Sequence, residues 1–232
     1  MTAHLRSLGH QVNRKRLQNL MRKMSLEAIY PKPNLSKSSR ESLKFPYLLK
    51  GLNIDHSNHV WAADITYIPT SNGYLYLMAV LDLFSRFVVS WQLSDNLESD
   101  FCVEALEKAL LQGTPRIFNT DQGVQFTCKR FVDSLQSREI GVSMDGKGRY
   151  WDNIFVERLW RTVKYEEVYL KGYEDGKAAQ KGLSEYFHFY NNERPHQSLN
   201  SCSPILIYQQ NRLDLLSGDA VPPLPLNPYG PK

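Results

Sequence analysis

The chain of 232 residues is 42% hydrophobic and 22% charged, which is typical of a globular protein that buries a full core. Its net charge of +4 conceals an asymmetry, because residues 1–50 hold 11 Lys and Arg against 2 acids whereas residues 51–232 hold 17 against 22. The basic N-terminal part is therefore the part expected to bind phosphates.

Cysteine usage and hydropathy argue against several other classes of protein. The three cysteines are odd in number and share no metal-ligand spacing, which speaks against both a disulfide framework and a zinc site. No apolar run reaches the roughly 18 residues of a membrane helix, and the polar N-terminus lacks a signal-peptide core. We expect a cytoplasmic protein with no membrane partner.

Residues 1–28 predict a small DNA-binding segment that consists of a short helix, a turn at Gly9 and a basic helix capped by Asn13. Apolar residues recur in the second helix at helical spacing, at Leu17, Leu20, Met21 and Met24. Its basic residues, expected to contact phosphates, are Arg14, Lys15 and Arg16. Residues 29–56 show no sustained periodicity and are predicted to be an exposed linker.

A main domain over residues 57–212 begins with a predicted antiparallel meander of three strands, in 59–69 and 73–94. Turn signals at Asn72-Gly73 and Ser85-Arg86 separate these strands. The elements predicted next are a helix, a strand, a helix and a strand, at 99–112, up to Asp121, at 128–137 and at 140–144. This order predicts an α/β fold with a mixed five-stranded sheet flanked by helices.

The C-terminal third predicts two further helices and a tail. A Gly-containing loop, residues 145–152, precedes one helix from 153 to about 170 and another from about 175 to 191. Five of the twelve prolines follow Ala220. We therefore expect residues 213–232 to form a Pro-rich disordered tail.

Three acids in this pattern are candidates for a shared metal site. Asp64 interrupts an apolar strand, Asp121 follows the end of another strand, and Glu157 borders the apolar stripe of a helix. Each also has a plainer explanation, as a satisfied structural aspartate, an Asx turn and a solvated glutamate respectively. If the three converge, their oxygens suit hard divalent cations. Two such ions about 3.5 to 4 Å apart support an in-line phosphoryl displacement.

Four motifs carry a resemblance to a known family. "WAADITYI", "TDQGVQF", "DNIFVERLWRTVKYE" and "YNNERPHQSL", with 35 residues between Asp121 and Glu157, resemble the integrase-type catalytic core of the Asp-Asp-Glu transposases. The similarity runs from Trp61 to Tyr208 and points to the OrfB subunit of IS-three-group insertion sequences. It implies a ribonuclease-H-like fold, and DNA strand cleavage and transfer with two Mg²⁺ or Mn²⁺ ions.

The resemblance also implies roles for particular residues. Asp64, Asp121 and Glu157 match the catalytic metal ligands, and Lys164 matches a basic residue that contacts the DNA end. Apart from the resemblance, Lys147 and Arg149 are expected to bind DNA because a basic, aromatic loop suits frayed ends, a merely solvated loop being the alternative. Arg161 is also expected to bind DNA. The N-terminal segment resembles part of the family's helix-turn-helix region, and the chain starts within that pattern, so we expect a partial DNA-binding segment.

Partners and mechanism follow from the same resemblance. The family pairs OrfB with an OrfA product that carries a helix-turn-helix and a leucine zipper, often by frameshift fusion. Two active sites acting on two element ends imply a homo-multimer on DNA. Hydrolysis at the element end would free a 3′-hydroxyl, which then attacks another DNA strand with no covalent protein intermediate.

Three alternatives to a transposase remain open. A metal nuclease of the same fold would only hydrolyse nucleic acid. A catalytically silent remnant would bind DNA as a regulator, although all three acids are intact. A tyrosine recombinase is the weakest alternative and depends on the "RPH" motif and Tyr208.

Other residues carry weaker hypotheses. Asp82 is either an acid that supports the site or a strand-end turn residue, and the "ERPHQSL" motif with Arg194, His196 and Gln197 is either a family signature or a helix terminus held by its own side chains. The tryptophans expected to be core residues are Trp61, Trp91 and Trp160.

Overall fold

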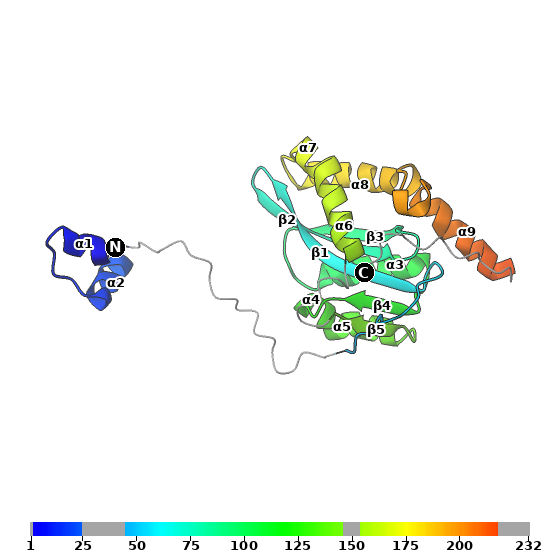
Figure 1. The fold of residues 1–232 in the computed structure, drawn as a ribbon, viewed down its shortest axis with the longest axis horizontal. Helices are drawn as coiled ribbons and strands as arrows, with labels where there is room; N and C mark the ends of the chain where they lie inside the picture. Colours follow the sequence, from blue (N-terminus) through cyan, green and yellow to red (C-terminus); the bar gives the residue numbers. More distant parts are fainter. Residues whose placement is uncertain (1, 25–44, 146–153, 218–232) are drawn as a thin grey trace. The chain divides into compact units, whose positions relative to one another are not determined.

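The computed structural model describes residues 2–24, 45–145 and 154–217. The chain divides into two compact units, Met1–Ser39 and Arg40–Lys232. Helices make up the described part of the first unit, whereas the second combines a sheet with helices (Figure 1).

The first unit contains α1 (Thr2–Ser7) and α2 (Arg14–Lys23), and Gly9 lies in the turn between them with φ of +86°. Glycine suits this turn because a positive φ is costly for residues with a side chain. The Asn13 side chain caps α2 by accepting a hydrogen bond of 2.8 Å from the backbone nitrogen of Arg16. The short helix, the turn and the capped basic helix are all present as predicted.

A five-stranded mixed sheet forms the centre of the second unit, which confirms the predicted fold class. The strands are β1 (Val60–Thr70), β2 (Gly73–Asp82), β3 (Val88–Ser94), β4 (Ile117–Thr120) and β5 (Gly141–Met144). Their order across the sheet is β3-β2-β1-β4-β5. The first three strands pair antiparallel as the predicted meander, whereas β4 pairs parallel to both β1 and β5.

Helices cover both faces of this sheet. They are α3 (Asp100–Gln112), α4 (Val124–Thr127), α5 (Lys129–Gln136), α6 (Ile154–Val163), the π-helix η2 (Lys164–Val168), α7 (Tyr169–Lys171), α8 (Gly176–Asn192), the 3-10 helix η3 (Gln197–Leu199) and α9 (Pro204–Ser217). The predicted long helices agree with α3, α5, the run from α6 to α7, and α8 to within one or two residues. Within the described ranges, none of the helices combines the length and apolar character needed to cross a bilayer.

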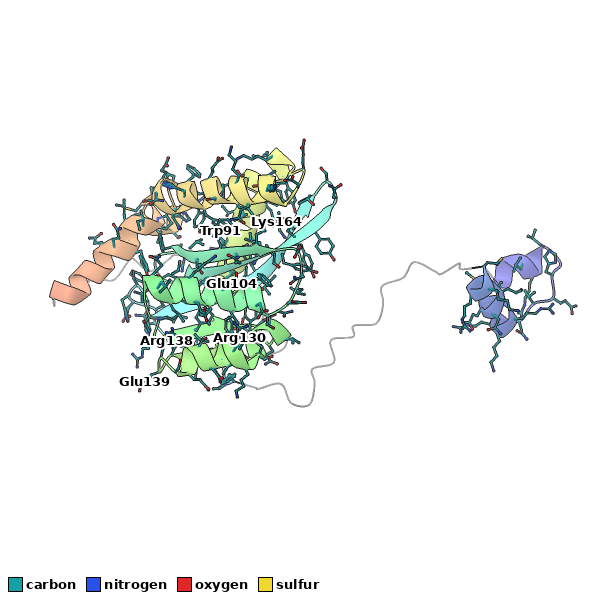
Figure 2. The ribbon with its side chains drawn as sticks, turned by 180° about the vertical axis from the view of Figure 1, so that it is seen from behind. Trp91, Glu104, Arg130, Arg138, Glu139 and Lys164 are labelled. Carbon is teal, nitrogen blue, oxygen red and sulfur yellow. The ribbon has the colours of Figure 1, made fainter. Side chains whose placement is uncertain are left out.

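Alternation along β1 separates the two faces. Val60 and Ala62 belong to the core beneath α6 and α8, whereas Trp61 and Ala63 belong to the core beneath α3 and α5. Figure 1 shows α6 crossing the sheet in front, and Figure 2 shows α3 and α5 over the opposite face.

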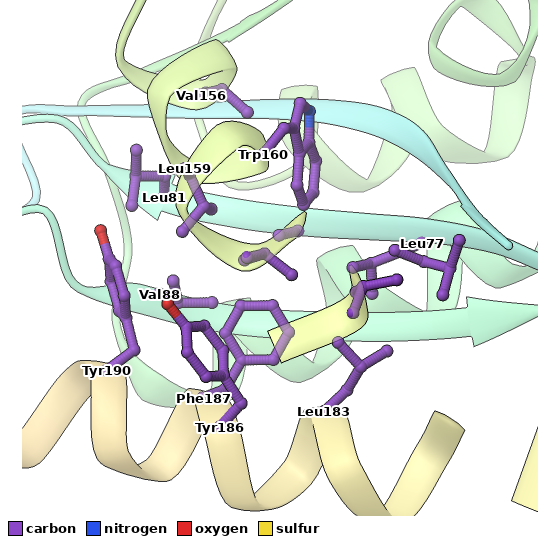
Figure 3. Packing of buried hydrophobic residues seen from close by; sticks show 14 of the residues in the cluster. Leu77, Leu81, Val88, Val156, Leu159, Trp160, Leu183, Tyr186, Phe187 and Tyr190 are labelled. Carbon is purple, nitrogen blue, oxygen red and sulfur yellow. The ribbon is translucent and has the colours of Figure 1, made fainter. Parts of the chain in front are cut away.

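The core beneath α6 fixes the direction of that helix. Val156, Leu159 and Trp160 of α6 are buried against the strands, and they share this core with Leu183 and Phe187 of α8 (Figure 3). Burial of several large apolar side chains at about 1.5–3 kcal/mol each holds the helix firmly against the sheet. The position of Glu157, between two of these anchors, is therefore set by the core.

Two predicted boundaries differ from the structure. In the predicted linker 29–56, the described part packs onto the main unit through Leu49, Leu52 and Ile54, and the backbone nitrogen of Leu48 donates a hydrogen bond to Ser143 Oγ. These side chains are only partly buried and their alternation with exposed residues is short and interrupted at Gly51, so the sequence showed no sustained period. At the other end, α9 continues to Ser217, five residues into the predicted tail, because the first helix-breaking proline there is Pro222.

Gly182 of α8 gives a test of this packing. A Cβ at this position would lie 2.6 Å from Cε1 of Tyr173 and 2.8 Å from Oε1 of Glu167. Both neighbours are buried and joined by a hydrogen bond of 2.7 Å, so neither can move away freely. We predict that Gly182→Ala lowers the free energy of unfolding by about 1–3 kcal/mol despite the better helix propensity of alanine.

Thermal denaturation checks this prediction against a matched control in the same helix. A Cβ at Gly176 would meet its nearest neighbour, Leu75 Cδ1, only at 3.7 Å. Gly176→Ala should therefore leave the melting temperature unchanged or raise it. Equal melting temperatures for the two variants would contradict the packing described here.

Candidate active site

The pairing of β1 with β4 brings Asp64 and Asp121 to the same level of the sheet. Val60 pairs with Ile117 and Ala62 with Asn119 in parallel register. The same register, carried two residues further, sets Asp64 beside Asp121, one residue beyond the end of β4. Backbones of neighbouring strands lie about 4.8 Å apart. The carboxyl ends of parallel strands, such as that of β4, are where α/β proteins commonly place their sites.

Asp64 is partly buried on the face of β1 that α6 covers. Its Oδ2 accepts a hydrogen bond of 2.9 Å from Nε1 of Trp160, and its Oδ1 accepts one of 2.8 Å from the backbone nitrogen of Ile65. Burial raises the pKa of Asp64, the nearby charges of Asp121 and Glu157 raise it further, and the two hydrogen bonds oppose the rise. Trp160 was expected to be a core residue alone, but it also orients this carboxylate.

Asp121 is exposed and forms the Asx turn that was its plainer explanation. Its Oδ1 accepts a hydrogen bond of 2.9 Å from the backbone nitrogen of Gly123. A Cβ on Gly123 would lie 2.8 Å from that oxygen, so only glycine allows this close approach. The turn fixes the direction of the carboxylate as it leaves β4, which is compatible with a further role for the same side chain.

Glu157 is exposed in the first turn of α6, and its charge reaches Asp64. Asp121 and Glu157 therefore lie within electrostatic reach of Asp64, near the carboxyl end of β4. Among the described residues, the one group of three His, Cys, Asp or Glu side chains whose ligand atoms lie within 4.8 Å of one another is Asp55, His56 and His59. The convergence of Asp64, Asp121 and Glu157 on a shared metal stays a prediction.

Arg86 supports the start of α6, whereas its sequence position predicted only a turn between strands. Its backbone adopts a left-handed conformation with φ of +63°. Its guanidinium carbon lies 3.5 Å from the ring centroid of Phe155. Burial lowers the pKa of Arg86 to about 10. This contact fixes the helix two residues before Glu157.

Lys164 lies at the start of η2, directly after α6. It is partly buried, and burial lowers the pKa of its ammonium group whereas the charge of Asp64 opposes this shift. The side chain therefore lies within electrostatic reach of Asp64. Figure 2 shows Lys164 from behind the sheet, near α8.

The other predicted DNA-binding residues fall in three places. Arg161 is exposed on α6. The basic residues Arg14, Lys15 and Arg16 are exposed at the start of α2 in the first unit. The two remaining residues, Lys147 and Arg149, lie outside the described residues.

The "ERPHQSL" motif holds helices together. Arg194 donates hydrogen bonds of 2.8 and 2.6 Å to the two carboxylate oxygens of Glu166, and Tyr186 donates a third to the same carboxylate. His196 is buried, and its burial lowers its pKa to about 4. Gln197 is exposed at the start of η3. These contacts tie the end of α8 to η2, which favours the helix-terminus interpretation of the motif.

Asp82 has the strand-end role and not a role beside the acids. It is fully buried, and burial raises the pKa of its carboxyl. Its oxygens accept hydrogen bonds of 2.7 Å from the backbone nitrogen of Asn58, and of 2.8 and 2.6 Å from the backbone nitrogen and hydroxyl of Ser85. The residue thus closes the turn between β2 and β3 and anchors the segment before β1.

Comparison with known proteins identifies relatives over most of the chain. Two family models, each described as an integrase core domain, match residues 55–149 and 138–204. The transposase of insertion sequence IS904 from Lactococcus lactis is 32% identical over 211 residues, covering 88% of this chain and 83% of the relative. Transposase InsF of IS3A from Escherichia coli K12 is 29% identical and covers 88% of this chain and 73% of its own length.

The fold has a counterpart among solved structures. The HTLV-2 integrase catalytic core domain in complex with magnesium superposes with a TM-score of 0.54 at 22% identity, covering 65% of this chain and 96% of that one. This likeness confirms the expected ribonuclease-H-like fold of integrase cores.

The raised pKa of Asp64 generates a prediction about stability. Because the folded chain holds the proton of Asp64 more tightly than the unfolded chain, the ionised carboxylate reduces stability, and the loss grows as pH rises through the folded pKa. Asp64→Asn should therefore raise the melting temperature at pH 7.5, and this gain should vanish below the ordinary pKa of an aspartate. Thermal denaturation across pH measures the effect.

Asp121→Asn serves as the matched control, because the same change is made at an exposed carboxylate at the same level of the sheet. Its effect on stability should stay within about 0.5 kcal/mol. If Asp64→Asn were no more stable than wild type at pH 7.5, the ionised carboxylate of Asp64 would not destabilise the folded chain.

Proposed function

Because this chain belongs to the insertion-sequence transposases that carry an integrase core domain, we propose that Asp64, Asp121 and Glu157 are the catalytic residues of its phosphoryl transfer. The observation that carries the proposal is the parallel register of β1 and β4, which sets Asp64 beside Asp121, with Trp160 of α6 bonded to Asp64 three residues after Glu157. Burial raises the pKa of Asp64, and the charges of the two other acids raise it further. Acids with shifted pKa values that gather at the carboxyl end of a strand are typical of functional sites.

The donor set fits a hard divalent cation. Three carboxylates near the carboxyl end of β4 would offer oxygen ligands alone. The repulsion of Asp64 by the two other charges would be relieved by a cation bound among them. We therefore assign Mg²⁺ or Mn²⁺ to Asp64, Asp121 and Glu157, with two ions, and the magnesium complex of the HTLV-2 integrase core supports this choice of metal. Such ions, when bound, supply positive charge to the oxygens of the phosphoryl group that is transferred.

The protein's own contribution is to hold these acids in place. Trp160 Nε1 and the backbone of Ile65 fix the two oxygens of Asp64, and the backbone of Gly123 fixes Asp121. Orientation by neighbouring hydrogen bonds is a general requirement of metal-ligating carboxylates. Glu157, exposed and joined to its backbone by a longer side chain, keeps the freedom to adjust to the substrate.

Basic residues next to the acids hold the DNA. Lys164 lies within electrostatic reach of Asp64, and Arg161 is three residues earlier on the continuous helix, so both side chains lie on one face. Two cations on this face can bind phosphates on either side of the scissile one. Lys147 and Arg149, which lie outside the described residues, are proposed to bind DNA because a basic, aromatic loop suits frayed ends.

The reaction proceeds in two displacements at phosphorus. In the first, a water oxygen bonds to phosphorus at the element end, the bond to the 3′-oxygen breaks, and that oxygen leaves as a 3′-hydroxyl. In the second, the 3′-hydroxyl oxygen bonds to a phosphorus of the target strand and releases another 3′-hydroxyl. No side chain of the protein becomes covalently attached to DNA.

Partners follow from the two-ended substrate. Simultaneous action on two element ends requires at least two active sites, so the protein works as a homo-multimer on DNA. The exposed basic start of α2 is the proposed contact of the first unit with phosphates. An OrfA-type product, separate or fused, is the proposed partner that completes recognition of the element ends.

Substitution of the three acids tests the catalytic assignment. Asp64→Asn, Asp121→Asn and Glu157→Gln should each lower cleavage and strand transfer by at least about 100-fold, since loss of one group that stabilises the transition state commonly costs 10²–10³. Binding to the element end should change little. Labelled ends of the element incubated with a target plasmid give the measurement, and only a transposase, unlike a nuclease, forms joined products.

Asp133→Asn on the exposed side of α5 is the matched control and should keep wild-type activity. Substantial activity in any of the three acid variants would remove that residue from the site.

The salt dependence of DNA binding tests the role of the first unit. Replacement of Arg14, Lys15 and Arg16 by alanine should weaken binding, and each lost phosphate contact should lower the slope of log affinity against log salt by about 0.9. The same measurement on Arg130→Ala with Arg138→Ala, two basic residues of the α5 side of the main unit (Figure 2), is the control and should leave the slope unchanged. An unaltered slope in the triple variant would show that α2 does not touch DNA.

A further inference from the structure

A second cluster of possible metal ligands lies just before β1. Nδ1 of His56 lies 2.5 Å from Oδ1 of Asp55, and Nδ1 of His59 lies 3.1 Å from the same oxygen. The two imidazole rings are stacked, with centroids 4.4 Å apart and planes inclined by 13°. Both histidines thus direct the same kind of nitrogen at one carboxylate oxygen, and all three ligand atoms lie within 4.8 Å of one another.

This cluster is separate from the proposed catalytic acids. His59 directly precedes the first residue of β1, whereas Asp64 lies five residues further along the strand. A strand rises about 3.3 Å per residue, so the two places are roughly 17 Å apart along β1. The two sites lie toward opposite ends of β4, since Val60 is level with its first residue and Asp64 lies beyond its last.

We propose that Asp55, His56 and His59 form a metal site for a single Zn²⁺ or a similar borderline divalent ion. Imidazole nitrogen is a ligand of zinc, copper and nickel, whereas Mg²⁺ prefers oxygen, so this site differs in kind from the three carboxylates. Tetrahedral bonds of about 2.0–2.2 Å set zinc ligands roughly 3.3 Å apart. Because an imidazole binds a metal in its own ring plane and the two rings are stacked, the half-exposed ring of His56 must rotate about its side-chain bonds to share an ion with the buried His59. The exposure of Asp55 leaves room for water as the fourth ligand.

The turn that carries the histidines is fixed by the core. The backbone nitrogen of His59 donates to the carbonyl of His56, and Asn58 between them adopts a left-handed conformation with φ of +64°. Asn58 is held on both sides, because its backbone nitrogen donates to Asp82 and its Oδ1 accepts hydrogen bonds from Trp61 and Tyr208. Because the backbone that carries the ligands is already fixed, less conformational freedom is lost on binding, which favours affinity.

Charge and burial set the expected strength of the site. His59 is buried and therefore rigid, whereas Asp55 is exposed and can adjust. Asp55 supplies one negative charge, and the positive charge of Arg116 acts on His59 and opposes a bound cation. A bound ion would tie the segment that leads into β1 to the beginning of that strand.

Zinc titration of the full chain by calorimetry, with saturating Mg²⁺ present, tests the proposal. Wild type should bind one Zn²⁺, and His56→Ala and Asp55→Asn should each bind it at least about tenfold more weakly, since even loss of a supporting partner of a metal ligand costs about 10- to 100-fold. His188→Ala removes an exposed histidine from α8 and is the matched control, with unchanged affinity. Asp64→Asn should also keep the affinity of wild type.

Two results would overturn the proposal. One is equal zinc affinity in wild type, His56→Ala and Asp55→Asn, and the other is loss of zinc binding in Asp64→Asn alone, which would place zinc among the catalytic acids. A measurement on unaltered protein removes any dependence on the folding of a variant. In histidine-labelled wild type, zinc should shift the imidazole nitrogen resonances of His56 and His59 and not those of His188, and absence of shifts at the first two also refutes the site.

Discussion

The parallel pairing of β1 with β4 is the constraint on which the rest of the structure depends. It sets Asp64 level with Asp121 at the carboxyl end of β4, although the two are far apart in sequence. The antiparallel pairing of β1 with β2 holds β1 from its other side, and α6 packs over it through a shared core. Glu157 thereby comes within electrostatic reach of Asp64 from a third element.

This arrangement places like charges together against their electrostatic preference. Burial of apolar side chains in the core stabilises the fold. This free energy offsets the cost of an ionised, largely buried carboxylate at Asp64. The indole of Trp160 shows how the two demands meet, because one side chain packs in the core and also donates a hydrogen bond to the acid. A divalent cation bound among the three acids, as proposed, would relieve this repulsion.

The sequence predicted the order of the elements and the three candidate acids, because hydrophobic period and turn residues are local signals. It could not establish that Asp64 and Asp121 lie side by side, since this depends on a long-range strand register. Trp160 was expected only to pack, because helical spacing does not distinguish a packed indole from one that also donates. Leu49 and Ile54 were placed in a linker because their alternation with exposed residues is too short to give a sustained period.

The central claim is that the carboxylates of β1, the end of β4 and α6 form one metal-dependent active site. A crystal structure of the full chain grown with Mn²⁺ tests it most directly, because anomalous scattering locates the ion without reference to activity. We expect anomalous density in contact with the carboxylates of Asp64 and Asp121, with the carboxylate of Glu157 turned toward it. Manganese bound elsewhere on a well-ordered chain, with Asp64 contacting only Trp160 and Ile65, would contradict it.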